Sequence, residues 1–326
     1  AVYNGRKEIL GEIHPDTLSV LNNLANSYSY LGEYNKALEM RNVVYNGRKE
    51  VLGVNHPDTV SSLHNLACSY FDLGDYNKAL ELQNTVCNAR KEILGESHSD
   101  TLAAFSNLAV LYSCLGYYNE GLKLQNTVYH TKKEILGENH PDTLRSLDDL
   151  ASSYSDLGDY SKACELQKKV YNARKEILGE NHPNTLRSLV DLASTYCDLG
   201  DYGRALKMRK VVYNARKRIL GENHPDTLTT LGNLASSYYN LGDYSKACEL
   251  QKTVYNARKE ILGENHPHTL NTLANLACSY SSLGDYGKAL EMRNVVYNER
   301  KEVLGVNHPD TLTTLANLAN SYSDLG

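Results

Sequence analysis

The stretch His224–Asn265, HPDTLTTLGNLASSYYNLGDYSKACELQKTVYNARKEILGEN, is one complete copy of a unit that recurs along the whole chain. Two series of glycines mark the copies at intervals of 42 residues: Gly11, Gly53, Gly95, Gly137, Gly179, Gly221, Gly263 and Gly305, and Gly32, Gly74, Gly116, Gly158, Gly200, Gly242, Gly284 and Gly326. A fixed period of this size indicates a stacked array whose units bury their apolar faces against their neighbours. We therefore expect residues 1–326 to form one elongated domain of about 7.8 repeats, since 326 residues are divided by a period of 42.

The first half of the unit predicts a helix, which we call helix A. Its apolar residues recur at helical and not at strand spacing: Leu228, Leu231, Leu234, Ala235, Tyr238 and Leu241. Pro225 suits the first helical turn, where no backbone donor is needed. Gly242 ends the helix, because it accepts a left-handed conformation that a Cβ would penalise.

The second half predicts another helix, helix B, over about Tyr244 to Leu262. Its apolar stripe comprises Tyr244, Ala247, Cys248, Val254, Tyr255, Ile261 and Leu262. Gln251 and Arg258 interrupt this stripe, and at the first of these positions other repeats also have Arg or Gln. Gly263 ends helix B, and a short connector leads into the next unit. Helix pairs joined in this way pack antiparallel.

These residues resemble the tetratricopeptide repeat in spacing and type, through Leu231, Leu234, Ala235, Tyr238, Gly242, Tyr244 and Ala247. The usual unit has 34 residues, and the longer unit with its LGxxHPDT junction is similar to the repeats of kinesin light chains. Similar repeats also occur beside nucleotide-binding signalling ATPases. The resemblance implies an all-α fold, a right-handed superhelical α-solenoid of antiparallel helix pairs. Ser99, Gly121 and Gln251 depart from the pattern locally, and the chain has no kinesin-light-chain heptad segment.

Composition narrows the function classes. The formal net charge is −5, with 34 basic and 39 acidic residues mixed throughout, so we expect no nucleic-acid partner. No apolar run is long enough for a transmembrane helix, and the first residues match repeat interiors and not a signal peptide. The seven cysteines form no matched pairs, which favours reduced thiols and a cytoplasmic location.

The resemblance implies that helix A lines a concave binding face. One outward-facing position of this helix is nearly uniform along the chain: Asn23, Asn65, Asn107, Asp149, Asp191, Asn233, Asn275 and Asn317. We call it the Asn series. A side-chain amide offers both a donor and an acceptor, so a row of amides could hold the backbone of an extended peptide. The alternative is that each Asn bonds to a neighbouring helix within the array.

Positions beside the Asn series vary between repeats, as specificity positions would, and the middle of the chain gathers charge there. The charged residues are Asp148, Asp149, Asp156, Asp191 and Asp198, with Arg145 and Arg187 nearby. They predict a preference for a basic ligand, unless carboxylates and arginines pair across adjacent helices. Three tyrosines outside the repeat pattern, Tyr30, Tyr117 and Tyr239, are candidates for ligand contact, whereas the regular tyrosines should pack between helices.

The sequence offers no site for a metal, a cofactor or catalysis. Each repeat contributes one histidine at the HP junction, from His14 to His308, and successive copies lie two helices apart, too far to share a zinc ion. We expect these imidazoles to cap or brace helix A. The glycines are explained by helix ends, and no serine lies in a G-x-S-x-G context. We expect no enzyme.

The chain begins at Ala1 within a helix B and ends at Gly326 after a helix A. Apolar surface is expected at both ends, from Val2, Ile9 and Leu10 and from Leu315, Leu318, Ala319 and Tyr322. Two explanations remain open, a segment cut out of a longer array and head-to-tail association into filaments. The sequence thus predicts a scaffold that binds proteins or peptides through helices A, with a filament-forming structural array or the ligand-sensing repeats of a larger signalling ATPase as alternatives.

Overall fold

The computed structural model describes residues 2–306 and 309–324, and in that part of the chain every regular element is an α-helix. Helices B are α1 (Val2–Leu10), α3 (Tyr34–Leu52), α5 (Tyr76–Leu94), α7 (Tyr118–Leu136), α9 (Tyr160–Leu178), α11 (Tyr202–Leu220), α13 (Tyr244–Leu262) and α15 (Tyr286–Leu304). Helices A are α2 (Pro15–Tyr30), α4 (Pro57–Asp72), α6 (Ser99–Cys114), α8 (Pro141–Asp156), α10 (Pro183–Asp198), α12 (Pro225–Asn240), α14 (Pro267–Ser282) and α16 (Pro309–Asp324). The predicted alternation of two helices per repeat is confirmed, with α13 at its predicted bounds.

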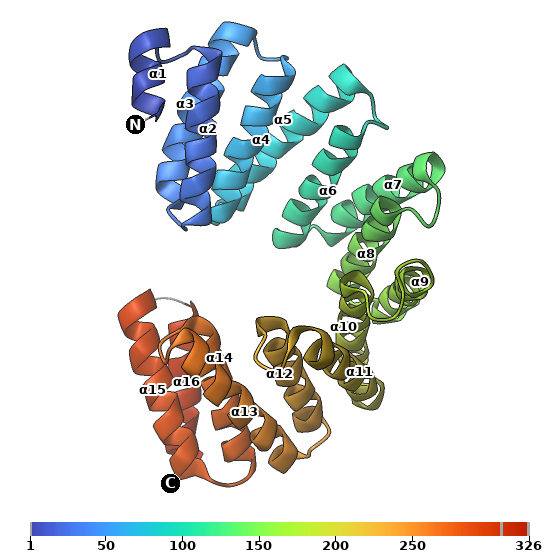
Figure 1. Ribbon diagram of the computed structural model, residues 1–326, viewed down its shortest axis with the longest axis vertical. Helices are drawn as coiled ribbons and strands as arrows, with labels where there is room; N and C mark the ends of the chain where they lie inside the picture. The colour runs from blue at the N-terminus through green and yellow to red at the C-terminus, as the bar shows by residue number, and fades with distance from the viewer. Residues whose placement is uncertain (1, 307–308, 325–326) are drawn as a thin grey trace. The chain divides into compact units, whose positions relative to one another are not determined.

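The helices form two compact units, Ala1–Leu166 and Gln167–Gly326, and the division falls inside α9. Within each unit consecutive helices pack side by side, as Figure 1 shows for α1 to α8 and for α10 to α16. Each unit is therefore an array of antiparallel helix pairs, and the predicted α-solenoid class is confirmed. That the whole chain forms one domain stays a prediction.

A histidine begins each helix A. In the described repeats the imidazole Nδ1 accepts a hydrogen bond from the backbone N–H two residues later, at 3.1–3.2 Å: His14, His56, His98, His140, His182, His224 and His266. This bond satisfies one of the donors that the first helical turn leaves without a partner. The capping role predicted from the sequence is confirmed for these histidines, while His308 lies outside the described residues.

A glycine with positive φ follows each helix A from α2 to α14. Gly242 has φ +82°, and the backbone N–H of Asp243 donates to the carbonyl of Tyr238 at 3.0 Å. A chain reversal that closes this bond requires the left-handed region, which is strained for residues with a Cβ. The predicted role of Gly242 is confirmed, and its equivalent Gly326 lies outside the described residues.

The core consists of the predicted stripes of the two helices. One valine of helix B is fully buried in each described repeat: Val44, Val86, Val128, Val170, Val212, Val254 and Val296. In one repeat Val254 packs with Leu228, Leu231 and Leu234 of α12, and the rings of Tyr213 and Tyr238 cover this cluster. The regular tyrosines shown here pack between helices, as expected from the sequence.

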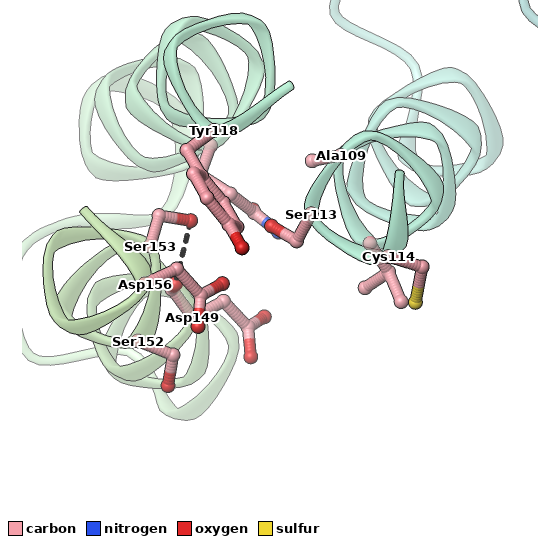
Figure 2. Close-up of a pocket in the computed structure, with 10 residues that line it drawn as sticks. Ala109, Ser113, Cys114, Tyr118, Asp149, Ser152, Ser153 and Asp156 are labelled. Atoms are coloured by element: carbon pink, nitrogen blue, oxygen red, sulfur yellow. Dashed lines mark hydrogen bonds between the residues drawn. The ribbon is translucent and has the colours of Figure 1, made fainter. Parts of the chain in front are cut away.

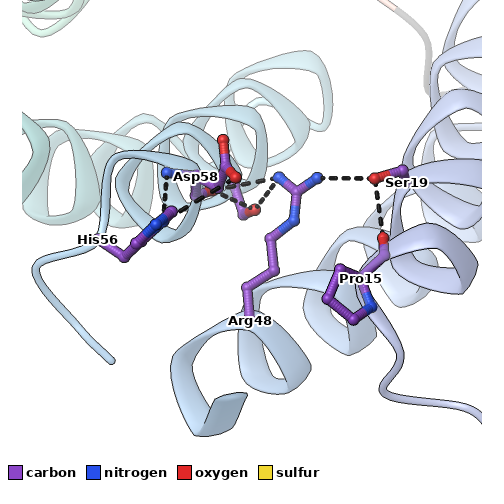
Figure 3. Close-up of polar contacts among 6 residues, drawn as sticks. Pro15, Ser19, Arg48, His56 and Asp58 are labelled. Carbon is purple, nitrogen blue, oxygen red and sulfur yellow. Dashed lines mark hydrogen bonds and ion pairs between the residues drawn. The ribbon is translucent and has the colours of Figure 1, made fainter. Parts of the chain in front are cut away.

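The arginine that interrupts the helix B stripe joins three helices. In Figure 3, Arg48 of α3 donates to the carbonyl of Asp58 at 3.1 Å and to Ser62 Oγ at 2.9 Å, both in α4. Its other terminal nitrogen donates to Ser19 Oγ of α2 at 3.4 Å. Arg258 makes the equivalent bonds to α14 and α12. This guanidinium therefore fixes successive helix pairs to each other, which explains a polar residue within an apolar stripe.

Candidate peptide-binding surface on helices A

Two cavities in the first unit lie between neighbouring helices A. Each is also lined by a glutamine of the helix B that connects those two helices. The α4–α6 slot has a volume of about 180 Å³ and is lined by His64, Ala67, Cys68, Phe71, Asp72, Gln83, Asn107, Val110 and Leu111. The α6–α8 slot has a volume of about 370 Å³ and is lined by Ala109, Val110, Ser113, Cys114, Tyr118, Gln125, Asp149, Ser152, Ser153 and Asp156.

The two slots are the same place in successive repeats. Gln83 and Gln125 are 42 residues apart, as are Asn107 and Asp149 of the Asn series, and each of these residues lines its own slot. The repeat thus forms the cavity at the same place in both cases, and the residues that line it differ. Positions of the Asn series lie at the walls of both slots, where the sequence predicted ligand contacts.

In the α4–α6 slot the polar side chains of His64, Cys68 and Gln83 contact each other beside several apolar residues. His64 Nδ1 lies 3.0 Å from Gln83 Oε1, and Gln83 Nε2 donates to the carbonyl of Ala104 at 3.0 Å. Burial lowers the pKa of His64 and raises the pKa of the Cys68 thiol, 3.7 Å from the imidazole. A neutral imidazole and thiol beside Phe71 suit an apolar side chain better than a charged one.

The α6–α8 slot is rich in hydrogen-bond acceptors. Figure 2 shows the hydroxyl of Tyr118 and the carboxylates of Asp149 and Asp156 directed into the space between the helices. Gln125 is only 3% exposed, and its Oε1 has no hydrogen-bond partner. Burial raises the pKa of the Cys114 thiol, and the charge of Asp156 acts in the same direction. Such a lining suits a ligand that donates hydrogen bonds and carries positive charge.

The Asn series divides by exposure. Four members are exposed: Asn23, Asn107, Asn275 and Asn317. The other four are half-buried: Asn65, Asp149, Asp191 and Asn233. The Asn65 side chain donates to Asn22 Oδ1 of the neighbouring helix A at 3.1 Å. Both interpretations therefore have support, since Asn65 braces the array and the exposed members remain accessible. Binding of a ligand by this series stays a prediction.

The predicted charge cluster is distributed over both units. In the first unit Arg145 pairs with Asp142 of its own helix at 3.6 Å, and Asp148, Asp149 and Asp156 belong to the same helix, α8. In the second unit Arg187 pairs with Asp191 of its own helix, α10, at 4.0 Å. The same helix carries Asp198. The ion pairs of these two arginines lie within one helix. Pairing of the carboxylates across adjacent helices stays a prediction. Burial raises the pKa of Asp191, against the charge of Arg187.

Tyr239, predicted to contact a ligand, is engaged within the array. Its hydroxyl lies 2.9 Å from Ser282 Oγ of the next helix A, and its ring centroid is 5.1 Å from that of Tyr244. This hydroxyl would have to exchange a partner to bind a ligand. Tyr30 and Tyr117 are exposed and retain the expected accessibility.

The apolar residues predicted at the chain ends are exposed with one exception. Val2, Ile9 and Leu10 of the first unit, and Leu315, Ala319 and Tyr322 of the second, are exposed. Leu318 is 6% exposed, so its expected contribution to apolar surface is wrong. Its repeat position is a core position in every described helix A after α2, for example at Leu276 and Leu234.

The sequence did not predict the role of the helix B position below the slots. Arg209 occupies this position in one repeat and donates to the carbonyl of Asn233 and to Ser237 Oγ, both at 2.8 Å and both in the next helix A. The detectable signal was a polar residue, always Arg or Gln, within an apolar stripe. Its function could not be read from one helix, because the acceptors belong to another.

Two further findings concern the described part of the chain. No group of three or more His, Cys, Asp or Glu side chains there is arranged to hold a metal ion. None of its helices combines the length and the apolar character that crossing a membrane requires.

Stacked helix pairs joined by conserved geometry at each junction, with slots between their helices A, define a helical-repeat protein. The chain belongs to the tetratricopeptide repeat family: the family model matches residues 16–92, 100–176, 148–218 and 226–300. No curated protein sequence matches the chain.

Solved structures agree with this assignment. The nearly identical TPR-like repeats of a Podospora anserina protein assigned to the kinesin light chains are 28% identical, with a TM-score of 0.58, over 63% of this chain and 98% of that one. A variant of the same repeats has 27% identity and a TM-score of 0.57, over 62% and 96%. A signal transduction ATPase with numerous domains and a tetratricopeptide repeat sensor, from Pyrococcus horikoshii, shares the fold at 15% identity and a TM-score of 0.63, over 95% of this chain and 45% of that one.

Proposed function

We propose that the protein is a non-enzymatic scaffold that binds an extended segment of another protein along its helices A. The observation that carries this proposal is the pair of slots in the first unit, which repeat the same cavity in successive repeats with different linings. A row of cavities at a fixed repeat suits a chain in extended conformation, because such a chain presents side chains at regular intervals.

The Asn series and the slots would divide the work of recognition. Exposed amides such as Asn107 and Asn275 would hold the peptide backbone, for which one donor and one acceptor suffice. The slots would select side chains, an apolar one between α4 and α6 and a polar, basic one between α6 and α8. Tetratricopeptide repeat arrays in general bind protein partners, which agrees with this assignment.

A peptide-array screen with the whole chain tests the proposal. We expect the chain to retain a subset of extended peptides and to lose them when Asn107 and Asn275 are both replaced by Ala. The proposal is wrong if no peptide is retained, or if the retained peptides bind the doubly substituted chain with unchanged affinity.

Self-association through the ends is a second candidate, favoured by the exposure of apolar side chains there. Ile9 is 82% and Tyr322 is 58% exposed. An exposed apolar surface of this kind is typical of contact sites. A sensor role within a larger signalling ATPase stays a prediction, because the similarity to the P. horikoshii protein is one of fold. We further propose a cytoplasmic location, since all seven cysteines are free thiols.

A further inference from the structure

The helix B position that provides the glutamine in both slots, Gln83 and Gln125, is occupied by one of two residue types along the chain. Among the described repeats it is arginine at Arg41, Arg209 and Arg293, and glutamine at Gln83, Gln125, Gln167 and Gln251. All lie at one repeat position, so the same surroundings accept either side chain. A comparison of the repeats therefore shows which oxygen atoms accept from a guanidinium at this position. It also shows how those atoms are arranged when the residue is glutamine.

Where the residue is arginine, the guanidinium is bonded to the next helix A. Arg209 Nη1 donates to the carbonyl of Asn233 and to Ser237 Oγ at 2.8 Å, residues 24 and 28 positions later. Arg41 donates to the equivalent Ser69 Oγ at 2.7 Å. Arg293 donates to the carbonyl of Asn317 at 3.2 Å and to Ser321 Oγ. The repeat thus provides a set of acceptors that binds a guanidinium.

Where the residue is glutamine, the amide is shorter and must find other partners. Gln251 Oε1 accepts from Ser279 Oγ at 2.6 Å, and both ends of the Gln83 amide are bonded. At Gln125 and Gln167 the carbonyl Oε1 remains buried without a partner, and of these two Gln125 lines a slot. The equivalent acceptors beside Gln125 are the Asp149 carbonyl and Ser153 Oγ, bonded to each other at 3.3 Å, as Ser237 and Asn233 are in the Arg209 repeat.

The α6–α8 slot also has the charge and the space for a guanidinium. Its lining residues include the carboxylates of Asp149 and Asp156 and no lysine, arginine or histidine. A guanidinium carries five N–H donors and no acceptor, so it matches a cavity lined by carboxylate, hydroxyl and amide oxygens. The cavity of about 370 Å³ lies within the range of pockets that hold organic ligands.

We infer that the α6–α8 slot is a specificity pocket for an arginine side chain of the bound protein segment. The arginine of the ligand then provides the guanidinium that the chain's own Arg41 and Arg209 provide in other repeats. It donates to Gln125 Oε1 and pairs with Asp156 at the mouth of the slot. This inference rests on the proposed scaffold function for the origin of the arginine, but the pocket itself can be tested separately.

The test uses N-acetyl-L-arginine methylamide and its citrulline and lysine counterparts, titrated into the whole chain and followed by NMR. We expect saturable shifts at Tyr118 and Ser152 with the arginine compound. The affinity for the citrulline compound should be at least about tenfold lower, because citrulline lacks the charge while keeping the shape. The lysine compound should also bind more weakly, because it lacks the planar fork of donors.

Three variants locate the binding. Gln125→Arg should abolish binding while leaving thermal unfolding unchanged or raised, because it places the chain's own guanidinium in the slot, as in other repeats. Gln251→Arg, at the same position where the amide is already bonded, is the matched control and should leave the affinity unchanged. Asp156→Asn, at an exposed position, should lower the affinity several-fold and weaken its dependence on salt.

The outcomes separate this inference from the scaffold proposal. Absence of saturable binding, equal affinity for the citrulline compound, or unchanged binding by both Gln125→Arg and Asp156→Asn would overturn the arginine pocket. If arrayed peptides bind through Asn107 and Asn275 without any preference for arginine, the scaffold proposal stands and the pocket is wrong. If the arginine compound binds and no peptide does, the pocket chemistry stands and the scaffold proposal is wrong.

Discussion

At the scale of single residues, each histidine from His14 to His266 that precedes a helix A stabilises the start of that helix by accepting one backbone N–H. Replacing His224 by Ala removes this acceptor. We expect the free energy of unfolding to fall by about 0.5–2 kcal/mol, the usual range for loss of an N-terminal cap. Urea denaturation followed by circular dichroism measures the change.

The control for His224 is its replacement by Asn, which also accepts a hydrogen bond at a helix N-terminus. This variant should retain most of the stability that His224→Ala loses. Equal losses in the two variants would show that the imidazole stabilises the junction through packing and not through capping.

The lowered pKa of His64 predicts that the contribution of this one residue to the stability of the fold depends on pH. Burial, assisted by the charges of Arg90 and Arg41, lowers its pKa in the folded state, and this outweighs the hydrogen bond to Gln83. The unfolded chain therefore takes up a proton at pH values where the folded chain does not. The contribution of His64 to stability is complete above about pH 6.5 and decreases as the pH falls towards the folded-state pKa.

The variant His64→Asn, which carries the residue found at Asn22 one repeat earlier, tests this prediction. The stability of the wild type minus that of the variant should decrease between pH 7 and pH 5 in chemical denaturation. A difference that is constant over this interval would mean that His64 takes up its proton equally in the folded and the unfolded chain.

Within the Asn series the structure separates ligand contact from internal bracing. Asn107→Ala should weaken a peptide found in the array screen by about 1–3 kcal/mol, if its amide pairs with the peptide backbone in a buried contact. Asn65→Ala is the matched control, because its amide already bonds to Asn22. It should lower thermal stability more than affinity, as measured by calorimetric titration and melting, and the reverse pattern would contradict the assignment.

At the scale of helices, the arginine that joins three helices predicts how firmly successive helix pairs hold together. Arg258→Met keeps the alkyl stem and removes the hydrogen bonds to His268, Thr272 and Thr229. We expect a loss of about 1.5–3 kcal/mol in the free energy of unfolding, the range for hydrogen bonds of charged groups. Denaturation of the whole chain measures this loss.

The chain contains a natural counterpart in Lys132, which stands at this position in one repeat. There Ser146 Oγ donates to the Thr143 carbonyl, whereas the equivalent Ser62 donates to the Asp58 carbonyl. Lys132→Arg should restore the bonds and raise the melting temperature. A neutral or negative effect would show that the guanidinium contributes little beyond its stem.

Helix positions could be predicted because they depend on local signals. The glycine period, the apolar stripe and the proline at the first turn all act within one helix or its adjoining turn, and the observed α13 follows them. The roles of Arg258 and Arg209 could not be predicted in the same way. Each depends on oxygen atoms of another helix A, and the sequence shows only that a polar residue interrupts an apolar stripe.

For the candidate site, the sequence pointed to residues on one face of helix A but not to the two cavities between the helices. The Asn series marked the face of helix A on which the two slots lie, since Asn107 and Asp149 line them. The bond from Tyr239 to Ser282 could not be predicted, because the two residues are 43 positions apart in sequence, and ligand contact by Tyr239 stays a prediction. Leu318 was misjudged because its position belongs to the core in every described helix A after α2, and α16 packs against α15.

At the scale of the whole molecule, the exposed apolar residues at the chain ends predict reversible self-association. Light scattering over a range of concentrations should show a rise in mean mass. Ile9→Lys should reduce this rise, because it places charge on an 82%-exposed position outside the core. A strictly monomeric chain at high concentration would exclude this route to filaments.

The choice between arginine and glutamine below the slots has a consequence for how such arrays change. Some codons for these two amino acids differ by a single nucleotide, so one mutation can exchange the residue at this position, where the repeat accepts either side chain. Segments such as Ala37–Thr59 and Ala289–Thr311 differ at one position, which indicates recent duplication. Copying repeats and switching this one residue would then let a lineage rewrite the order of open and closed pockets along the chain, and hence its partners, while keeping its fold.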